Sequence, residues 1–134
     1  MSAQNKTPHS VPSESGIILL AHGSRQPAWR EPFDLILTQI ASQSKGPAIL
    51  AFGEFMQPDL SQAVKTLALS GVKRAVIVPL FLGGGIHVRS DLPALAQKAR
   101  EESGMELTVA EAIGQVPEVL QAIAAYSLRL SESF

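Results

Sequence analysis

Two histidines and one glutamate are the residues of this sequence best suited to chemistry. His22 directly follows an apolar run, Glu54 lies near the end of a second run, and His87 follows a third run and a glycine turn. Two neutral imidazoles and a carboxylate suit a borderline divalent ion such as cobalt, nickel, iron or zinc. The sequence contains no cysteine, which excludes thiolate metal sites and thiol nucleophiles. The pattern therefore indicates a metal site with nitrogen and oxygen ligands.

Each of the three residues also has a purely structural interpretation. His22 could simply bond to nearby backbone, and Glu54 could cap a helix or pair with Arg25 or Lys73. His87 is harder to explain in this way, because it follows three consecutive glycines that would let the backbone approach a ligand closely. The functional interpretation is therefore favoured for His87 and left open for the other two.

Arginines accompany the two histidines. Arg25 and Arg89 flank them in the sequence, and on a chain with a net charge of -1 they are candidates to meet the carboxylates of an anionic ligand. Arg30 is interpreted instead as a solvated surface charge. Gly84 and Gly85 complete the candidate ligand-binding set, because a glycine turn offers a ligand bare backbone.

Two other kinds of site are disfavoured by the motifs. The segment Gly83–Val88 reads GGGIHV, which matches neither GxGxxG nor GxxxxGK[ST], and no lysine follows it. A nucleotide-binding loop is therefore weakly supported. Ser24 lies beside His22, but the sequence has no GxSxG, so a nucleophilic serine is not indicated.

The apolar runs predict the elements that position these residues. We expect strands over 16–21, 47–55, 74–82 and 106–110, and helices over 29–42, 59–70, 90–103 and 116–130. The alternation predicts an α/β fold with a small four-stranded parallel sheet and helices on both faces. Ligands bind beyond the carboxyl ends of such strands, which is where the candidate residues fall. Exposed strands at the edges of so small a sheet favour a homodimer.

Length, charge and hydropathy limit the function classes. The 134 residues suit one domain, taken as 16–134, and the polar segment 1–15, which contains His9, is interpreted as a disordered tail. Lys and Arg total 11 against 12 Asp and Glu, which argues against a nucleic-acid partner. No apolar run is long enough to cross a membrane, and the first residues lack the apolar stretch of a signal peptide. We therefore expect a cytoplasmic protein.

Three segments together resemble a known family. They are Leu19–Arg25 (LLAHGSR), Phe52–Pro58 (FGEFMQP) and Val78–Pro93 (VPLFLGGGIHVRSDLP). Their order and content are similar to the sirohydrochlorin chelatases of the CbiX type, and the similarity extends over about residues 16–127. Three motifs in order make the resemblance fairly specific, whereas the first motif alone would not.

The resemblance implies a class II chelatase fold, a flavodoxin-like half. Longer relatives hold two such halves in one chain, and the short form assembles as a homodimer. The family inserts a divalent metal into a tetrapyrrole without ATP, cobalt for cobalamin synthesis or iron or nickel for related rings, and an organic cofactor is not expected. Its two metal-binding histidines correspond to His22 and His87, and its acidic partner corresponds to Glu54.

These inferences combine into one hypothesis. His22 and His87 bind the incoming ion on one face of sirohydrochlorin, and Glu54 ligates it or relays protons. Arg25 and Arg89 contact the carboxylates of the ring. The alternatives are a non-catalytic tetrapyrrole- or metal-binding module of the same fold and a flavodoxin-like nucleotide domain.

Overall fold

The computed structural model describes residues 15–83 and 86–134, with the backbone alone for 86–90. The elements follow the order β1 (Ser15–Ala21), η2 (Pro27–Arg30), α2 (Glu31–Gln43), β2 (Ala48–Phe52), α3 (Leu60–Leu69), β3 (Arg74–Pro79), α4 (Ile86–Ser103), β4 (Glu106–Val109), η3 (Ile113–Gln115) and α5 (Pro117–Ser131). All the predicted strands and helices are present. The predicted tail falls outside the described residues, except that Ser15 already belongs to β1.

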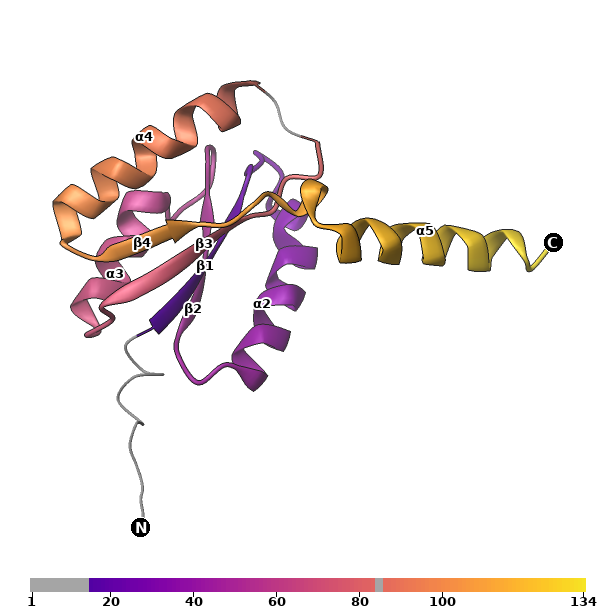
Figure 1. The fold of residues 1–134 in the computed structure, drawn as a ribbon, viewed down its shortest axis with the longest axis horizontal. Helices are drawn as coiled ribbons and strands as arrows, with labels where there is room; N and C mark the ends of the chain where they lie inside the picture. The colour runs from indigo at the N-terminus through magenta and orange to yellow at the C-terminus, as the bar shows by residue number, and fades with distance from the viewer. Residues whose placement is uncertain (1–14, 84–85) are drawn as a thin grey trace, which may run out of the picture.

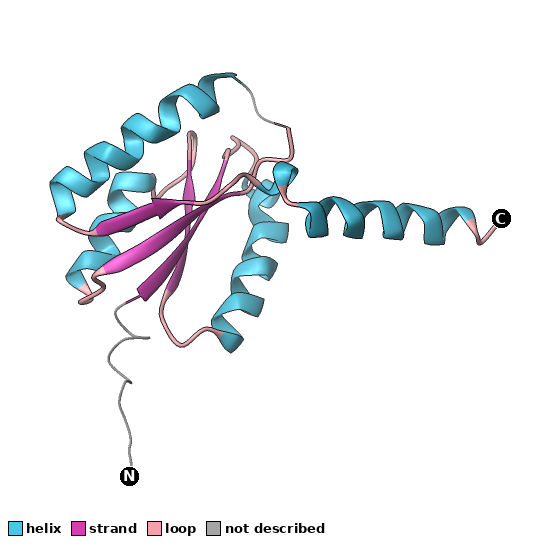
Figure 2. Cartoon of the chain, viewed as in Figure 1, coloured by secondary structure: helices cyan, strands magenta, loops and turns pink. Residues whose placement is uncertain are grey.

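The strands form one parallel sheet in the order β2-β1-β3-β4. Helix α2 covers one face, and α3 and α4 cover the other (Figures 1 and 2). The predicted fold, a small parallel sheet with helices on both faces, is confirmed. The order places β1 between β2 and β3, so the segments that follow these three strands emerge side by side at one edge.

The sheet has a core on each face. On the side of α3 and α4, the fully buried Ile18 and Ile77 pack with Val64. On the side of α2, Leu19 of β1 packs with Phe52 of β2. Neighbouring residues of β1 therefore enter opposite cores, which explains why this strand is a continuous apolar run rather than an alternating one.

Local signals set several helix ends as predicted. Asp59 caps α3 by accepting a hydrogen bond from the Gln62 backbone N–H at 2.8 Å, and the Gln62 side chain accepts one from the Asp59 N–H at 2.9 Å. Gly71 and Gly104, with φ of 92° and 73°, follow α3 and α4. Such left-handed conformations end helices and favour glycine.

The β3–α4 connection differs from the expectation. β3 ends at Pro79 instead of extending to residue 82, although the Leu80 N–H still donates to the Leu20 carbonyl at 2.8 Å. α4 begins at Ile86 rather than at residue 90. Leu92 is the first buried hydrophobic residue of this helix among those described, and the turn formed by residues 86–89 precedes it. His87 consequently belongs to a helix and not to a loop.

The last predicted helix, over 116–130, is present as α5. Its apolar stripe consists of Val119, Leu120, Ile123, Ala124 and Leu128. The helix packs only near η3 and projects away from the sheet, so that its stripe is exposed from Leu120 onward (Figure 1). No helix in the described part of the chain is long and apolar enough to cross a membrane.

Candidate functional site

The candidate residues gather at the carboxyl edge of the sheet. His22 directly follows β1, and Glu54 lies in the loop that follows β2. His87 lies in the first turn of α4, beyond the glycine turn that follows β3. Because β1 lies between β2 and β3, His22 occupies the middle position of the three.

The His22 ring is held against a buried aromatic ring. Its centroid lies 4.2 Å from that of Phe81, with the planes tilted by 42°. Phe81 belongs to the core on the side of α3 and α4 and is only 4% exposed, whereas His22 is exposed. This contact directs the imidazole toward the segment that follows β3, which leads to the glycine turn. Sequence reasoning missed Phe81, whose apolar neighbours identify it only as a core residue.

Backbone hydrogen bonds fix Glu54 beside His22. The Gly53 N–H donates to the Ala21 carbonyl at 2.8 Å, and the Glu54 N–H donates to the His22 carbonyl at 3.0 Å. Gly23 adopts a φ of 98°, and a Cβ there would lie 1.8 Å from the Glu54 carbonyl oxygen. The two backbones can approach this closely only because position 23 carries no side chain.

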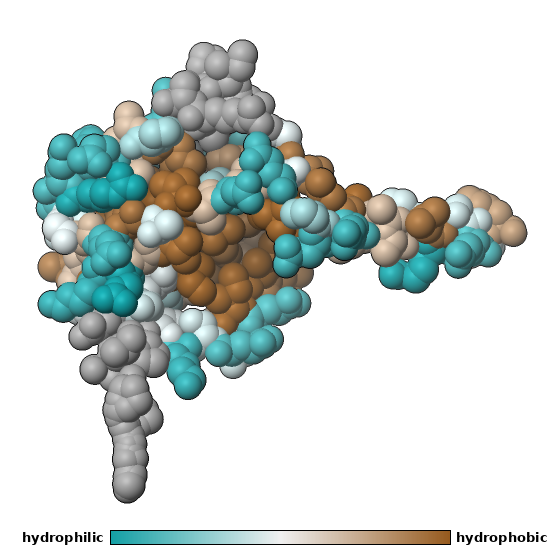
Figure 3. All heavy atoms as spheres, in the orientation of Figure 1, coloured by the Kyte–Doolittle hydropathy of each residue, from teal (hydrophilic) through white to brown (hydrophobic). Residues whose placement is uncertain are grey.

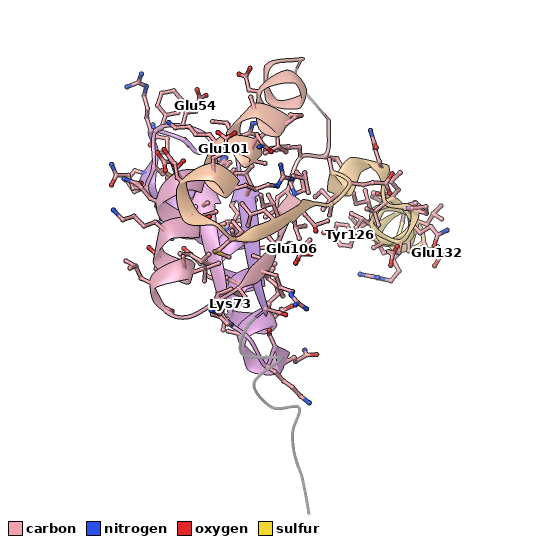
Figure 4. All side chains as sticks on the ribbon, turned by 60° about the vertical axis from the view of Figure 1, so that its left-hand side comes forward. Glu54, Lys73, Glu101, Glu106, Tyr126 and Glu132 are labelled. Atoms are coloured by element: carbon pink, nitrogen blue, oxygen red, sulfur yellow. The ribbon has the colours of Figure 1, made fainter. Side chains whose placement is uncertain are left out.

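The structural alternatives for Glu54 receive no support. Glu54 lies at the carboxyl end of the sheet, whereas Lys73 lies at the opposite end (Figure 4). Among the side chains that the structure describes, the one ion pair joins Arg30 to Asp34 at 3.1 Å. Glu54 does not cap α3 either, since Asp59 does so. Its exposed carboxylate is accessible at the edge of the sheet.

The loop that follows β2 also presents an aromatic ring. Phe55 is 55% exposed and adopts a φ of 68°, which side-chain-bearing residues rarely occupy. The guanidinium carbon of Arg25 lies 4.4 Å from the centre of its ring, a cation–π distance. Sequence reasoning missed Phe55, for which the motif around Glu54 was the only available signal. The two side chains form a flat, partly cationic surface beside His22 and Glu54.

Arg30, which was expected to be a solvated surface charge, is half-buried and has local partners. It pairs with Asp34 one turn along the chain, and its guanidinium lies 5.0 Å from the centre of the Phe52 ring. These contacts hold it against α2 and away from ligand binding.

The remaining predicted residues have no described side chains. Gly84 and Gly85 lie outside the described residues, and of His87 and Arg89 only the backbone, in the first turn of α4, is described. Within the described side chains, no group of three or more acidic or histidine residues could hold a metal. His22 and Glu54 are the part of the predicted ligand set whose side chains the structure describes.

Curated relatives of this chain have a named activity. The sirohydrochlorin cobaltochelatase of Saccharolobus solfataricus is 32% identical over 117 residues, which cover 78% of this chain and 89% of the relative. That of Sulfurisphaera tokodaii is 31% identical over 111 residues, with 79% and 88% covered. These relatives confirm the expectation of a chelatase, a lyase-type enzyme.

Solved structures share the fold. A putative cobalamin biosynthesis CbiX protein from Marinobacter aquaeolei superposes with a TM-score of 0.80 at 34% identity, over 90% of this chain and 99% of its own. The cobalt complex of the sirohydrochlorin chelatase SirB from Bacillus subtilis gives 0.71 at 21% identity, over 84% of this chain and 49% of its own. The family model CbiX matches residues 16–129, and the chain therefore belongs to the CbiX family, as its three motifs indicated.

Proposed function

We propose that this protein inserts Co²⁺ into sirohydrochlorin without ATP. The observation that carries the proposal is an exposed histidine beside a carboxylate at the carboxyl edge of the sheet. Phe81 orients the His22 ring, and the Glu54 N–H donates a hydrogen bond to the His22 carbonyl. The names of the relatives from Saccharolobus and Sulfurisphaera support the reaction and the metal. Fe²⁺ and Ni²⁺ are the alternative ions, because two imidazoles and a carboxylate accept all three.

The ion is held by His22, His87 and Glu54. His22 and Glu54 emerge from neighbouring strands, and His87 follows the strand on the other side of β1. Neutral imidazole and carboxylate ligands bind a divalent ion firmly enough to deliver it. They also leave ligand positions open for the ring nitrogens, as an insertion site requires.

Insertion of a divalent ion releases two protons from the ring. The metal-free ring loses two pyrrole N–H protons as four ring nitrogens take the divalent ion, so the products are the metallated ring and two protons. An imidazole nitrogen that ligates the ion cannot accept a proton through the same lone pair. We therefore assign metal binding to His22 and His87 and a share of the proton transfer to Glu54, whose exposed carboxylate can pass protons to water.

The ring itself meets a second group of residues. Arg25 and Arg89 contact its carboxylates, and Gly84 and Gly85 let the backbone approach its face. The exposed Phe55 ring, which already stacks with Arg25, adds an apolar surface on which a flat macrocycle can lie. The arginines then hold the carboxylates at the edge of the ring, and the Phe55 side chain stacks on its face.

The proposal also includes a homodimer, with the cytoplasm as its location. Nucleic acid and membrane are not proposed as partners. The projecting α5, whose apolar stripe is exposed among the residues that the structure describes, supports self-association (Figure 1).

The visible absorption of sirohydrochlorin tests the reaction. Metal-free ring and Co²⁺ are mixed with a catalytic amount of protein without ATP, and Fe²⁺ and Ni²⁺ are run in parallel. The proposal expects conversion of many rings per protein, fastest with Co²⁺. A spectral change limited to one ring per protein would instead identify the non-catalytic binding module, and no change with any ion would refute the proposed substrate.

A further inference from the structure

Gly114 of η3 lies directly against the segment that follows β3. Its N–H donates to the Phe81 carbonyl at 3.1 Å, and a Cβ at this position would lie 1.7 Å from the Leu82 carbonyl oxygen. Cβ atoms essentially never approach another atom within 3.0 Å, so a side chain fits here only if one of the two backbones shifts. The φ of Gly114 lies outside the positive range. The close approach alone therefore requires glycine.

The segment that carries Gly114 is anchored to the sheet. Ahead of it, the Ala110 N–H donates to the Ile77 carbonyl at 2.9 Å, and the partly buried Ala112 packs against the core on the side of α3 and α4. The Gln115 N–H closes the turn by donating to the Ala112 carbonyl at 2.9 Å. Figure 3 shows apolar surface where the base of α5 joins the body of the domain. The sheet and its core therefore set the position of Gly114.

On the other side of the contact, the anchoring ends at Phe81. The Leu80 N–H is still bonded to β1, and Phe81 is 4% exposed, whereas Leu82 is 56% exposed and leads into the glycine turn. α4 begins four residues after Leu82, and His87 lies in its first turn. A Cβ on Gly114 would therefore displace the Phe81–Leu82 peptide more readily than it would displace η3.

Both histidines of the proposed metal site depend on this peptide. The Phe81 ring supports the ring of His22, with 4.2 Å between the centroids, and the chain beyond Leu82 carries His87. Loss of a group that orients a metal ligand typically lowers metal affinity about 10- to 100-fold. A displaced Phe81–Leu82 peptide should therefore be felt at the metal.

We propose that Gly114 is a positioning residue of the site. Its bare backbone lets η3 lie against the Phe81–Leu82 peptide, and this contact holds the support of the His22 ring and the start of the glycine turn in the arrangement that binds the ion. The inference deepens the proposed function, because it takes His22 as a metal ligand. The position of the His22 ring can nevertheless be measured without any metal.

Gly114→Ala is examined first in the metal-free protein. The imidazole proton signals of His22 carry the ring current of Phe81, and their loss in His22→Gln identifies them. We expect these signals to shift in Gly114→Ala, because the Phe81 backbone moves and its ring moves with it. Two controls should leave them in place. Gln115→Ala changes the neighbouring exposed side chain, and Gly71→Ala adds a Cβ that would meet nothing within 4 Å.

The same three variants are then compared in Co²⁺ binding by titration calorimetry. We expect Gly114→Ala to lower the Co²⁺ affinity about tenfold or more, and both controls to keep the affinity of the unmodified protein. Gly71→Ala separates affinity from stability, because its φ of 92° makes it costly without any clash. Circular dichroism checks that each variant is folded.

Three outcomes are decisive. A folded Gly114→Ala variant with unchanged His22 signals would overturn the inference. Shifted signals with unchanged Co²⁺ affinity would overturn it as well, since the contact would then not serve the site. Shifted signals in a protein whose unmodified form binds no Co²⁺ would refute the proposed metal site and still support the positioning of His22 by Gly114.

A second measurement uses the unmodified protein and does not depend on whether Gly114→Ala folds. Coupling is reciprocal, so a contact that raises Co²⁺ affinity is itself stabilised when the ion binds. Hydrogen exchange of the Gly114 N–H reports the opening of this contact. The control is the Gly71 N–H, which donates to the Ala68 carbonyl at the same distance of 3.1 Å. We expect saturating Co²⁺ to slow exchange at Gly114 about tenfold more than at Gly71. Equal slowing at the two glycines would contradict the inference.

Discussion

The imidazole of His22 rests on the ring of Phe81, with 4.2 Å between the ring centroids. One residue follows β1 and is exposed, and the other follows β3 and is buried. The contact therefore joins the proposed metal ligand to the core of the domain. A rigid support of this kind restricts the ring orientations that would otherwise cost entropy when the ion binds.

Replacing the support should weaken metal binding more than it weakens the fold. We expect Phe81→Leu to cost about 1–1.5 kcal/mol in the free energy of unfolding. We expect it to lower Co²⁺ affinity about tenfold, because the His22 ring loses its orientation. Titration calorimetry and urea unfolding measure the two quantities. Phe33→Leu, at a partly buried position on the α2 side, is the control and should leave the affinity unchanged.

Replacing the three histidines one at a time tests which of them bind the ion. His22→Ala and His87→Ala should each lower kcat/KM for cobalt insertion by about 100-fold or more, because a ligand to the ion is lost. His9→Ala should have no effect, because His9 lies in the segment interpreted as a solvated tail. Initial rates of insertion, followed by the visible spectrum of the ring, give kcat/KM for each variant. Wild-type rates in a folded His22→Ala variant would contradict the assigned role.

Substitutions of Gly23 and Gly71 distinguish the cost of a steric clash from the cost of a positive φ alone. Both have a positive φ, but a Cβ at Gly23 would lie 1.8 Å from the Glu54 carbonyl oxygen, whereas a Cβ at Gly71 would meet nothing within 4 Å. Gly71→Ala should therefore cost only the conformational penalty of about 1–2 kcal/mol. Gly23→Ala should cost at least about 2 kcal/mol more, or displace the Glu54 loop and abolish insertion. Equal unfolding free energies and full activity for the two variants would refute the close approach.

Arg25 is expected to act on the ring and not on the ion. Arg25→Ala should raise KM for sirohydrochlorin roughly 10-fold or more, since a charge-assisted contact contributes about 1.5–3 kcal/mol. Its Co²⁺ affinity in the absence of the ring should be unchanged. The same change at Arg30, which pairs with Asp34, should leave KM as it is. A loss of Co²⁺ affinity in Arg25→Ala would instead place this residue in the metal site.

Patterns along the chain predicted the elements and one edge of the site. Continuous apolar runs identified strands buried on both faces, and the ends of those runs placed the candidates His22 and Glu54 at the carboxyl edge of the sheet. This succeeds because a strand fixes where its following residue emerges. The same patterns gave Arg30 only as a solvated surface charge and did not predict its pairing with Asp34.

Other features depend on contacts that no local pattern contains. The apolar stripe of α5 shows that the helix has an apolar face but not which surface covers it. Phe55 adopts its positive φ because the loop turns within hydrogen bonds such as Met56 N–H to the Glu54 carbonyl at 2.8 Å, and phenylalanine itself has no preference for that conformation. The stacking of Phe81 on His22 joins segments that follow different strands, so it becomes visible only in three dimensions.

The separation of α5 from the sheet also sets an order of events during synthesis. Within the described residues, Leu107 is the last buried hydrophobic residue of the chain. The core can therefore close once β4 has left the ribosome, while α5 is still being made. The final helix then reaches solvent attached to a body that is already folded.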